Sequence, residues 1–227
     1  MSDVDWSRIR LVVFDVDGTL YSQRAIRIKM IAKLIGRAIR EASIRPLWII
    51  RYYRQCRENL ADAETEDFEA VLLERTARAC RVSIEEVRRV IGVWMEQQPL
   101  SLLRAARYPH LDRIFTALRQ RGIAIGILSD YPAAEKLKAL DLAADHVVWA
   151  GEPSVQMLKP NPRGLQVLMD AAGVTPEQTL MVGDRDERDG EIARRLKVQA
   201  LIRSRKPLAG RNSFSSYDAA IFSALLG

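Results

Sequence analysis

Short apolar segments that end at polar residues recur along the chain. Five of them have the length and the β-branched composition of strands buried on both faces of a parallel sheet, at residues 11–14, 123–128, 146–149, 179–182 and 198–202. Segments with helical spacing of apolar residues alternate with them, at residues 110–121, 132–140, 162–172 and 188–196. Pro162 and Gly173 stand where a helix is expected to begin and end. This alternation predicts an α/β fold in which helices cover both faces of a parallel sheet.

A long segment, residues 21–103, separates the first predicted strand from the helix that precedes the second, far more chain than a single crossover needs. Apolar residues recur in it at helical spacing, along one stripe of Ile26, Met30, Leu34 and Ala38 and a second stripe of Ile31, Ile35, Ile39 and Ala42. The pattern predicts a helical domain inserted after the first strand. We therefore expect a core of residues 1–20 and 104–227 and a helical domain of residues 21–103.

The composition, with 48% hydrophobic and 28% charged residues among 227, is typical of a folded globular protein. Its two cysteines, Cys56 and Cys80, are too few for a disulfide framework and lack metal-ligand spacing. The chain starts with acidic residues where a signal peptide has basic ones, and no segment reaches the roughly 18 apolar residues of a membrane span. We expect a soluble protein of the cytoplasm. The net charge of +6 mildly favours anionic partners, and no motif points to nucleic acid.

Polar residues follow most of the predicted strands, at the edge where an open parallel sheet binds its ligands. They are Asp15, Asp17, Ser129, Asp130, Lys159, Asp184, Asp186 and Asp189. Taken singly, Asp17-Gly18 has a simple structural explanation as a turn, and Ser129 has one as a helix cap. Such explanations do not account for the arrival of all these groups at one edge of the sheet. We therefore expect a site there.

These residue types fit phosphoryl transfer. Aspartate carboxylates are the hard oxygen ligands that Mg²⁺ prefers, and a carboxylate held beside the metal can attack phosphorus to form an aspartyl-phosphate. A hydroxyl group, backbone amides and a lysine can neutralise the phosphoryl oxygens. A second acid two residues along can protonate the leaving oxygen and then activate water.

The motifs resemble those of the haloacid dehalogenase superfamily. Asp15-Val16-Asp17-Gly18-Thr19-Leu20 is similar to the first motif, and the second, third and fourth are matched in order by Ser129, Lys159-Pro160, and Gly183-Asp184 with Asp189. The helical insertion lies where this family has its type-1 cap, so the resemblance implies a Rossmann-like core with an inserted α-helical cap. Asp17 implies the phosphatase branch, because the dehalogenases of the family lack that acid and its phosphonate-cleaving members usually have a small residue there.

The resemblance implies a role for each matched residue. Asp15 would be the nucleophile and a Mg²⁺ ligand, and Asp17 the general acid and base, with its backbone carbonyl on the metal. Asp184 would bind Mg²⁺, and Asp189 would bind it directly or through water. Ser129 would hold a phosphoryl oxygen, and Lys159 would pair with Asp15 and the phosphate, both as catalytic residues. The remaining candidates for contact with the substrate are Gly18, Thr19 and Asp130. Asp130 departs from the Asn frequent in relatives, and its role stays open because a carboxylate there would repel phosphate.

Charge is divided unevenly within the insertion. Residues 21–57 carry ten basic residues and the single acid Glu41, whereas residues 58–74 carry seven acids and no base. The favoured interpretation is that the two stretches pack antiparallel and neutralise each other. The alternatives are a cap surface that selects polyanionic substrates, and a basic helix on anionic lipid with Trp48, Tyr52 and Tyr53 at the interface. Arg24 and Arg27, three residues apart, are expected to reach the distal part of a bound phosphoester.

The sequence thus predicts a Mg²⁺-dependent phosphatase that acts on a small phosphomonoester through an aspartyl-phosphate on Asp15. Two alternatives stay open. One is a phosphomutase of the same superfamily, which shares all four motifs. The other is a non-catalytic module on the same fold that binds a lipid surface or a partner.

Overall fold

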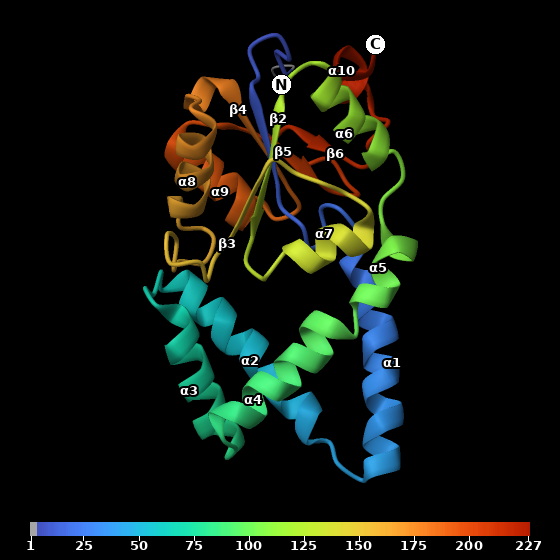
Figure 1. Ribbon diagram of the computed structural model, residues 1–227, viewed down its shortest axis with the longest axis vertical. Helices are drawn as coiled ribbons and strands as arrows, with labels where there is room; N and C mark the ends of the chain where they lie inside the picture. The colour runs from blue at the N-terminus through green and yellow to red at the C-terminus, as the bar shows by residue number, and fades with distance from the viewer. Residues whose placement is uncertain (1–3) are drawn as a thin grey trace.

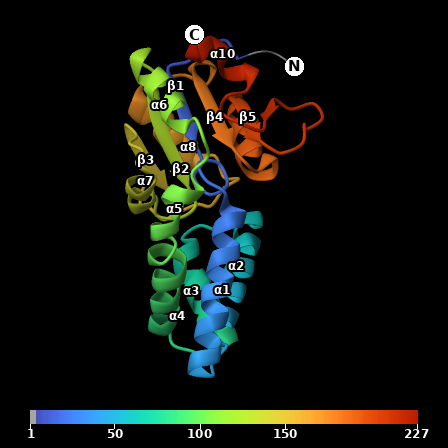
Figure 2. The same ribbon diagram turned by 90° about the vertical axis from the view of Figure 1, so that its right-hand side faces the viewer.

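A computed structural model describes residues 4–227; residues 1–3 of the acidic start lie outside the described residues. Figure 1 shows an α/β core that carries both chain ends, and a helical lobe at the opposite end of the molecule. Figure 2 shows the same two parts from the side, with the helical lobe below the sheet. The predicted fold class is confirmed. Among the described residues, no helix combines the length and hydropathy needed to cross a membrane.

The core sheet has six parallel strands in the order β3-β2-β1-β4-β5-β6. They are β1 (Leu11–Phe14), β2 (Ala124–Ser129), β3 (His146–Trp149), β4 (Thr179–Gly183), β5 (Gln199–Arg203) and β6 (Ser213–Phe214). The five predicted strands are confirmed to within a residue or two, and β6 was not predicted because its two residues form no apolar segment. Burial of β3 on both faces was a wrong expectation. This strand lies at the sheet edge, and Val147 is 36% exposed.

Helices cover both faces of the sheet, as predicted (Figure 1). The side chains of Leu11 and Val13 pack with α8 (Arg163–Ala172) and α9 (Glu191–Leu196). Those of Val12 and Phe14 belong to the cluster that includes α6 (Leu111–Gln120) and α10 (Ser223–Leu226). The remaining elements of the core are α7 (Ala134–Leu140), the 3-10 helices η2 (Pro176–Gln178) and η4 (Ala220–Phe222), and the π-helical turn η3 (Asp186–Gly190). Residues 188–190, predicted as the start of α9, lie in η3 instead.

The helical lobe, called the cap from here on, lies between β1 and β2. Its helices are α1 (Gln23–Glu41), α2 (Arg45–Asp62), α3 (Phe68–Cys80), α4 (Ile84–Ile91), the π-helical η1 (Gly92–Gln97) and α5 (Leu100–Ala106). Helix α5 runs past residue 103, where the sequence placed the end of the helical domain. The division into a core of residues 1–20 and 104–227 and a helical domain of residues 21–103 stays a prediction. Helix α1 begins at the N-cap Ser22, whose hydroxyl accepts a hydrogen bond from the backbone N–H of Ala25 (3.4 Å).

Only one of the two apolar stripes predicted on α1 is buried. Ile26, Met30 and Leu34 pack inside the cap. Ile31, Ile35 and Ile39, from the second stripe, are exposed. Successive helical residues turn by about 100°, so the second stripe lies beyond the side of α1 that the other cap helices cover.

Core arginines bind the acidic stretch of the cap. The acid–arginine pairs are Glu58 with Arg185 (2.9 Å) and Arg188 (2.9 Å), Asp62 with Arg188 (2.6 Å), Glu64 with Arg195 (2.6 Å) and Glu66 with Arg163 (2.8 Å). Mutual neutralisation of the two cap stretches is therefore a wrong interpretation for these four acids. They join the cap to the core instead.

Removal of both acids that pair with Arg188 is expected to destabilise the protein. The Arg188 side chain is only 7% exposed, so the double variant Glu58→Gln, Asp62→Asn leaves a nearly buried guanidinium without its carboxylates. We expect a loss of about 1–3 kcal/mol in the free energy of unfolding, measured by urea titration. Glu66→Gln is the control, since its partner Arg163 is 44% exposed and such pairs contribute about 0–1 kcal/mol. Equal losses in both variants would contradict this account.

Candidate active site

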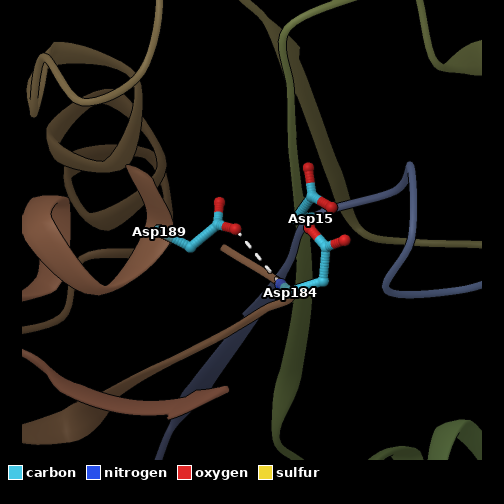
Figure 3. A group of neighbouring side chains, drawn as sticks. All are labelled: Asp15, Asp184 and Asp189. Carbon is cyan, nitrogen blue, oxygen red and sulfur yellow. Dashed lines mark hydrogen bonds between the residues drawn. The ribbon is translucent and has the colours of Figure 1, made fainter. Parts of the chain in front are cut away.

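Three aspartates meet at the carboxyl edge of the central strands. Asp15 directly follows β1, and its backbone N–H donates to Val182 O of β4 (2.9 Å). Asp184 directly follows β4, and Asp189 lies in η3. Figure 3 shows the side chains of Asp15 and Asp184 close together, with Asp189 reaching in from η3. Each of the three offers an oxygen atom within 4.8 Å of the others, so they could hold a metal ion.

Burial makes this cluster electrostatically unfavourable without a cation. It raises the pKa of Asp15 above its usual range, and, with the charge of Asp189, it raises the pKa of Asp184 to about 7. Lys159 offsets part of the negative charge: its Nζ lies 2.5 Å from Asp15 Oδ1 and 2.8 Å from Asp189 Oδ1. Burial disfavours the ammonium, but the carboxylates of Asp15 and Asp189 outweigh it and raise the pKa of Lys159. The hard, anionic oxygen donors of the cluster fit Mg²⁺.

The loop after β1 holds Asp15 in place. Thr19 Oγ1 donates to Asp15 Oδ2 (2.8 Å), and the buried Tyr217 hydroxyl donates to Thr19 O (2.9 Å). Gly18 has φ +101°, and a Cβ there would lie 2.0 Å from Asp184 Oδ2, so only glycine fits. The Thr19 hydroxyl therefore orients Asp15. Tyr217 lies in the C-terminal segment, outside every motif, so the sequence did not predict its contact with this loop.

Asp17 lies in a different environment from Asp15. Lys136 Nζ, from α7, is 2.7 Å from both carboxylate oxygens of Asp17, and the Tyr21 hydroxyl donates to one of them. Burial raises the pKa of Asp17, but Lys136 and Tyr21 outweigh it and hold that pKa below its usual range. The sequence did not mark Lys136, because a lysine within an exposed-looking helix carries no local signal.

Ser129 and Asp130 follow β2. Ser129 is buried, and its Oγ accepts a hydrogen bond from the backbone N–H of Tyr131 (3.2 Å). The Asp130 carboxylate accepts one from the backbone N–H of Lys159 (3.1 Å), and its backbone carbonyl accepts one from Arg57. The hydrogen bond to Lys159 explains how a carboxylate is accommodated at this position.

A cavity of about 510 Å³ opens above these groups, between the core and the cap. Asp15, Asp17, Lys136 and Lys159 line its core side, whereas Arg27, Arg54 and Arg57 line its cap side. Burial, with the like charge of Arg27 nearby, lowers the pKa of Arg54. Arg24 instead lines an adjacent groove that also includes Gly18 and Asp184. The sequence singled out Arg27 but missed Arg54 and Arg57, because nothing in it tells which side of α2 faces the core.

Comparison with known families matches residues 9–197 to the model of haloacid dehalogenase-like hydrolases. Phosphoglycolate phosphatase of Rhodospirillum rubrum is 27% identical over 216 residues, which cover 92% of this chain and 87% of the relative. Phosphoglycolate phosphatase of Escherichia coli strain K12 is 35% identical over 80 residues, only 34% of this chain and 32% of the relative.

Solved structures share the fold. A HAD-hydrolase of Bacillus subtilis bound to magnesium has a TM-score of 0.70 at 11% identity, over 96% of this chain and 99% of that chain. A 2-haloacid dehalogenase of Pseudomonas syringae has a TM-score of 0.62 at 16% identity, over 92% of this chain and 94% of that chain. These likenesses, at such low identity, concern the arrangement of core and cap.

Loss of Lys136 is expected to raise the pKa of Asp17, because burial then acts unopposed by the ammonium. In Lys136→Met, the pKa of Asp17 should rise by about one unit or more, followed by NMR titration of its carboxyl carbon in the metal-free protein. Lys138→Met is the matched control: it lies on the same helix, and its ion pair with Glu135 is exposed. If both variants keep the wild-type titration, Lys136 does not set the protonation of Asp17.

Magnesium affinity is expected to depend on pH through the aspartate cluster. The metal binds the carboxylate form, whereas the metal-free protein holds a proton on Asp184 below a pKa of about 7. The apparent Kd should therefore rise by about tenfold or more per pH unit below about pH 6 and level off above about pH 8, in calorimetric titrations. A Kd that stays constant across this range would contradict the raised pKa of the cluster.

Proposed function

The chain belongs to the haloacid dehalogenase-like hydrolases, and we propose that it hydrolyses a small phosphoric monoester, with Asp15 as nucleophile and Asp17 as general acid and base. The observation that carries the proposal is the setting of Asp15. Lys159 and Thr19 bind its two oxygens beside Asp184 and Asp189, at the floor of a cavity of about 510 Å³. Volumes of this order suit small-molecule ligands.

In the first half-reaction, a carboxylate oxygen of Asp15 attacks phosphorus. A P–O bond to Asp15 forms while the P–O bond to the leaving alcohol breaks, and Asp17 donates its proton to the leaving oxygen. Lys159, already in contact with Asp15, lies where its charge would attract the transferring phosphoryl oxygens.

In the second half-reaction, water attacks the aspartyl-phosphate. Asp17 accepts a proton from this water, the P–O bond to Asp15 breaks, and inorganic phosphate and the free carboxylate result. Lys136 and Tyr21, which bind the ionised Asp17, favour the basic form that this step needs.

Asp15, Asp184 and Asp189 would hold Mg²⁺, and the backbone carbonyl of Asp17 would be the further ligand that the family resemblance implies. When bound, the ion would compensate negative charge on the phosphoryl group as a Lewis acid. The raised pKa values of Asp15 and Asp184 support this assignment, since burial and the neighbouring carboxylates disfavour their ionised forms and a bound cation would favour them.

The cap side of the cavity is basic. Arg27 and Arg54 face the catalytic carboxylates across it, and the guanidinium fork of arginine suits a carboxylate or a second phosphate. We therefore propose a small phosphomonoester with a second anionic group. Phosphoglycolate, named in the R. rubrum relative, carries a carboxylate and fits this description.

A cytoplasmic location is also proposed. The observation in its favour is that Cys56 and Cys80 are both free thiols, as expected in a reducing compartment.

Replacement of the nucleophile is expected to abolish turnover while the fold survives. Asp15→Asn removes the attacking oxygen charge and one candidate metal ligand, so kcat should fall by about 10³-fold or more for p-nitrophenyl phosphate. Residual activity of the variant within about tenfold of wild type would remove Asp15 from the mechanism.

Two measurements on the wild-type enzyme test the metal and the reaction class. Chelator should stop turnover, and added Mg²⁺ should restore it. Phosphate release without a bisphosphate activator would show that the enzyme is a hydrolase and not a phosphomutase.

Loss of the two cap arginines is expected to affect anionic substrates selectively. Arg27→Ala with Arg54→Ala should raise KM for phosphoglycolate by about tenfold or more but change kcat/KM for p-nitrophenyl phosphate by less than about twofold. Arg51→Ala, an exposed position on the same helix as Arg54, is the control. Equal losses on both substrates would mean that these arginines support the cap instead of substrate recognition.

A further inference from the structure

The outer side of α1 carries an exposed row of four isoleucines, called the α1 stripe here. Its members are Ile28, Ile31, Ile35 and Ile39, which are 59%, 49%, 48% and 76% exposed. Helical spacing places them opposite the buried Ile26, Met30 and Leu34, and α1 faces the viewer in Figure 2. The stripe runs for about 16 Å along the helix. Single exposed apolar residues are ordinary, but an ordered row of four large ones is typical of a binding surface.

Basic residues border the α1 stripe along its length. Lys29 and Arg40 lie on one side of it, and Arg27 lies on the other. Among the side chains that the structure describes, these three residues have no ion pair, and Arg40 binds only the neutral backbone carbonyl of Gly36. Four acids of the nearby acidic stretch, Glu58, Asp62, Glu64 and Glu66, bind core arginines instead.

The exposed isoleucines and the cations beside them indicate the chemistry of the partner. Two copies of α1 packed stripe to stripe would bury their isoleucines but bring the bordering cations of both copies together. An anionic bilayer offers both features at once: acyl chains for the stripe and negative headgroups for its borders. The helix itself is too polar to cross a bilayer, so it would lie in the interface.

The α1 stripe also continues into the catalytic region. A groove of about 530 Å³ runs from Gly18 and Asp184 to Ile28 and Ile31. Arg24, Arg27, Arg203 and Arg205 line the same groove. Attachment through the stripe would therefore bring the groove beside the catalytic carboxylates to the lipid surface.

We propose that the α1 stripe binds the surface of anionic membranes, with the isoleucines in the headgroup–acyl boundary and the bordering cations on anionic headgroups. The inference does not depend on the proposed phosphatase activity. It takes up the lipid alternative left open by the charge pattern, but assigns the contact to α1 instead of Trp48, Tyr52 and Tyr53.

Vesicle co-sedimentation of the full chain tests the proposal. The protein should bind phosphatidylcholine vesicles that contain about 30% phosphatidylglycerol, bind pure phosphatidylcholine at least about tenfold less, and dissociate as salt is raised toward about 0.5 M. Ile35→Ser with Ile39→Ser should weaken binding by about tenfold or more, because it removes apolar area without a change in charge. Neither residue lines the catalytic cavity, so turnover of p-nitrophenyl phosphate should stay the same and report the intact fold.

Two further variants separate the contributions. Lys29→Gln with Arg40→Gln should lower binding to anionic vesicles and reduce its salt dependence. Ile84→Ser, at an exposed isoleucine on α4, should leave binding unchanged. The proposal is overturned by an absence of vesicle binding, by equal binding to neutral vesicles, or by full binding of the Ile35, Ile39 variant. A dimer in light scattering that this variant dissociates would overturn it in favour of a second copy.

Discussion

The arrangement of this molecule depends on three carboxylates and one ammonium that meet at the carboxyl edge of the sheet, all of them buried except the half-buried Asp184. Asp15, Asp184 and Asp189 face one another there, with Lys159 between Asp15 and Asp189. When all three aspartates are ionised, their three negative charges against one positive leave an excess of two, which is the charge a divalent cation would balance. The sheet order brings these groups together, because β1 lies between β2 and β4 and the direction of winding changes at that point. The close approach of Gly18 to Asp184 follows from the same crowding.

The acidic and the basic residues of the cap have different surroundings. The acids near the end of α2 and after it meet core arginines such as Arg185 and Arg188. Basic residues of α1 and α2, namely Arg27, Arg54 and Arg57, line the cavity instead. Arg188 also donates to Lys159 O (3.2 Å), so the joint between cap and core touches the backbone of Lys159. The acidic residues of the cap thus bind it to the core, whereas its basic residues are available to bind ligands.

The sequence predicted the features that have a local cause. Strands such as β1 and β4 are short apolar segments, and the residues that follow them are the site residues, so the pattern of strands also located Asp15 and Asp184. Residues that reach the site from elsewhere had no such signal. Lys136 comes from α7, Tyr217 from the C-terminal segment and Arg54 from a helix whose orientation only tertiary packing decides. The same limit applies to α1: the periodicity predicts two apolar stripes, but it does not tell which of them the other cap helices cover.

Asp15 and Asp17 are two residues apart, yet their neighbours move their pKa values in opposite directions. Burial among carboxylates raises the pKa of Asp15, whereas Lys136 and Tyr21 lower that of Asp17. An ionised Asp17 suits the second half-reaction of the proposed mechanism but lacks the proton that the first requires. A phosphomonoester that enters the cavity brings negative charge close to Asp17, and a like charge favours the protonated form of a carboxyl group. Substrate binding would therefore itself promote the proton uptake that leaving-group departure needs, and once the alcohol has left with that proton, Lys136 and Tyr21 again favour the base that activates water.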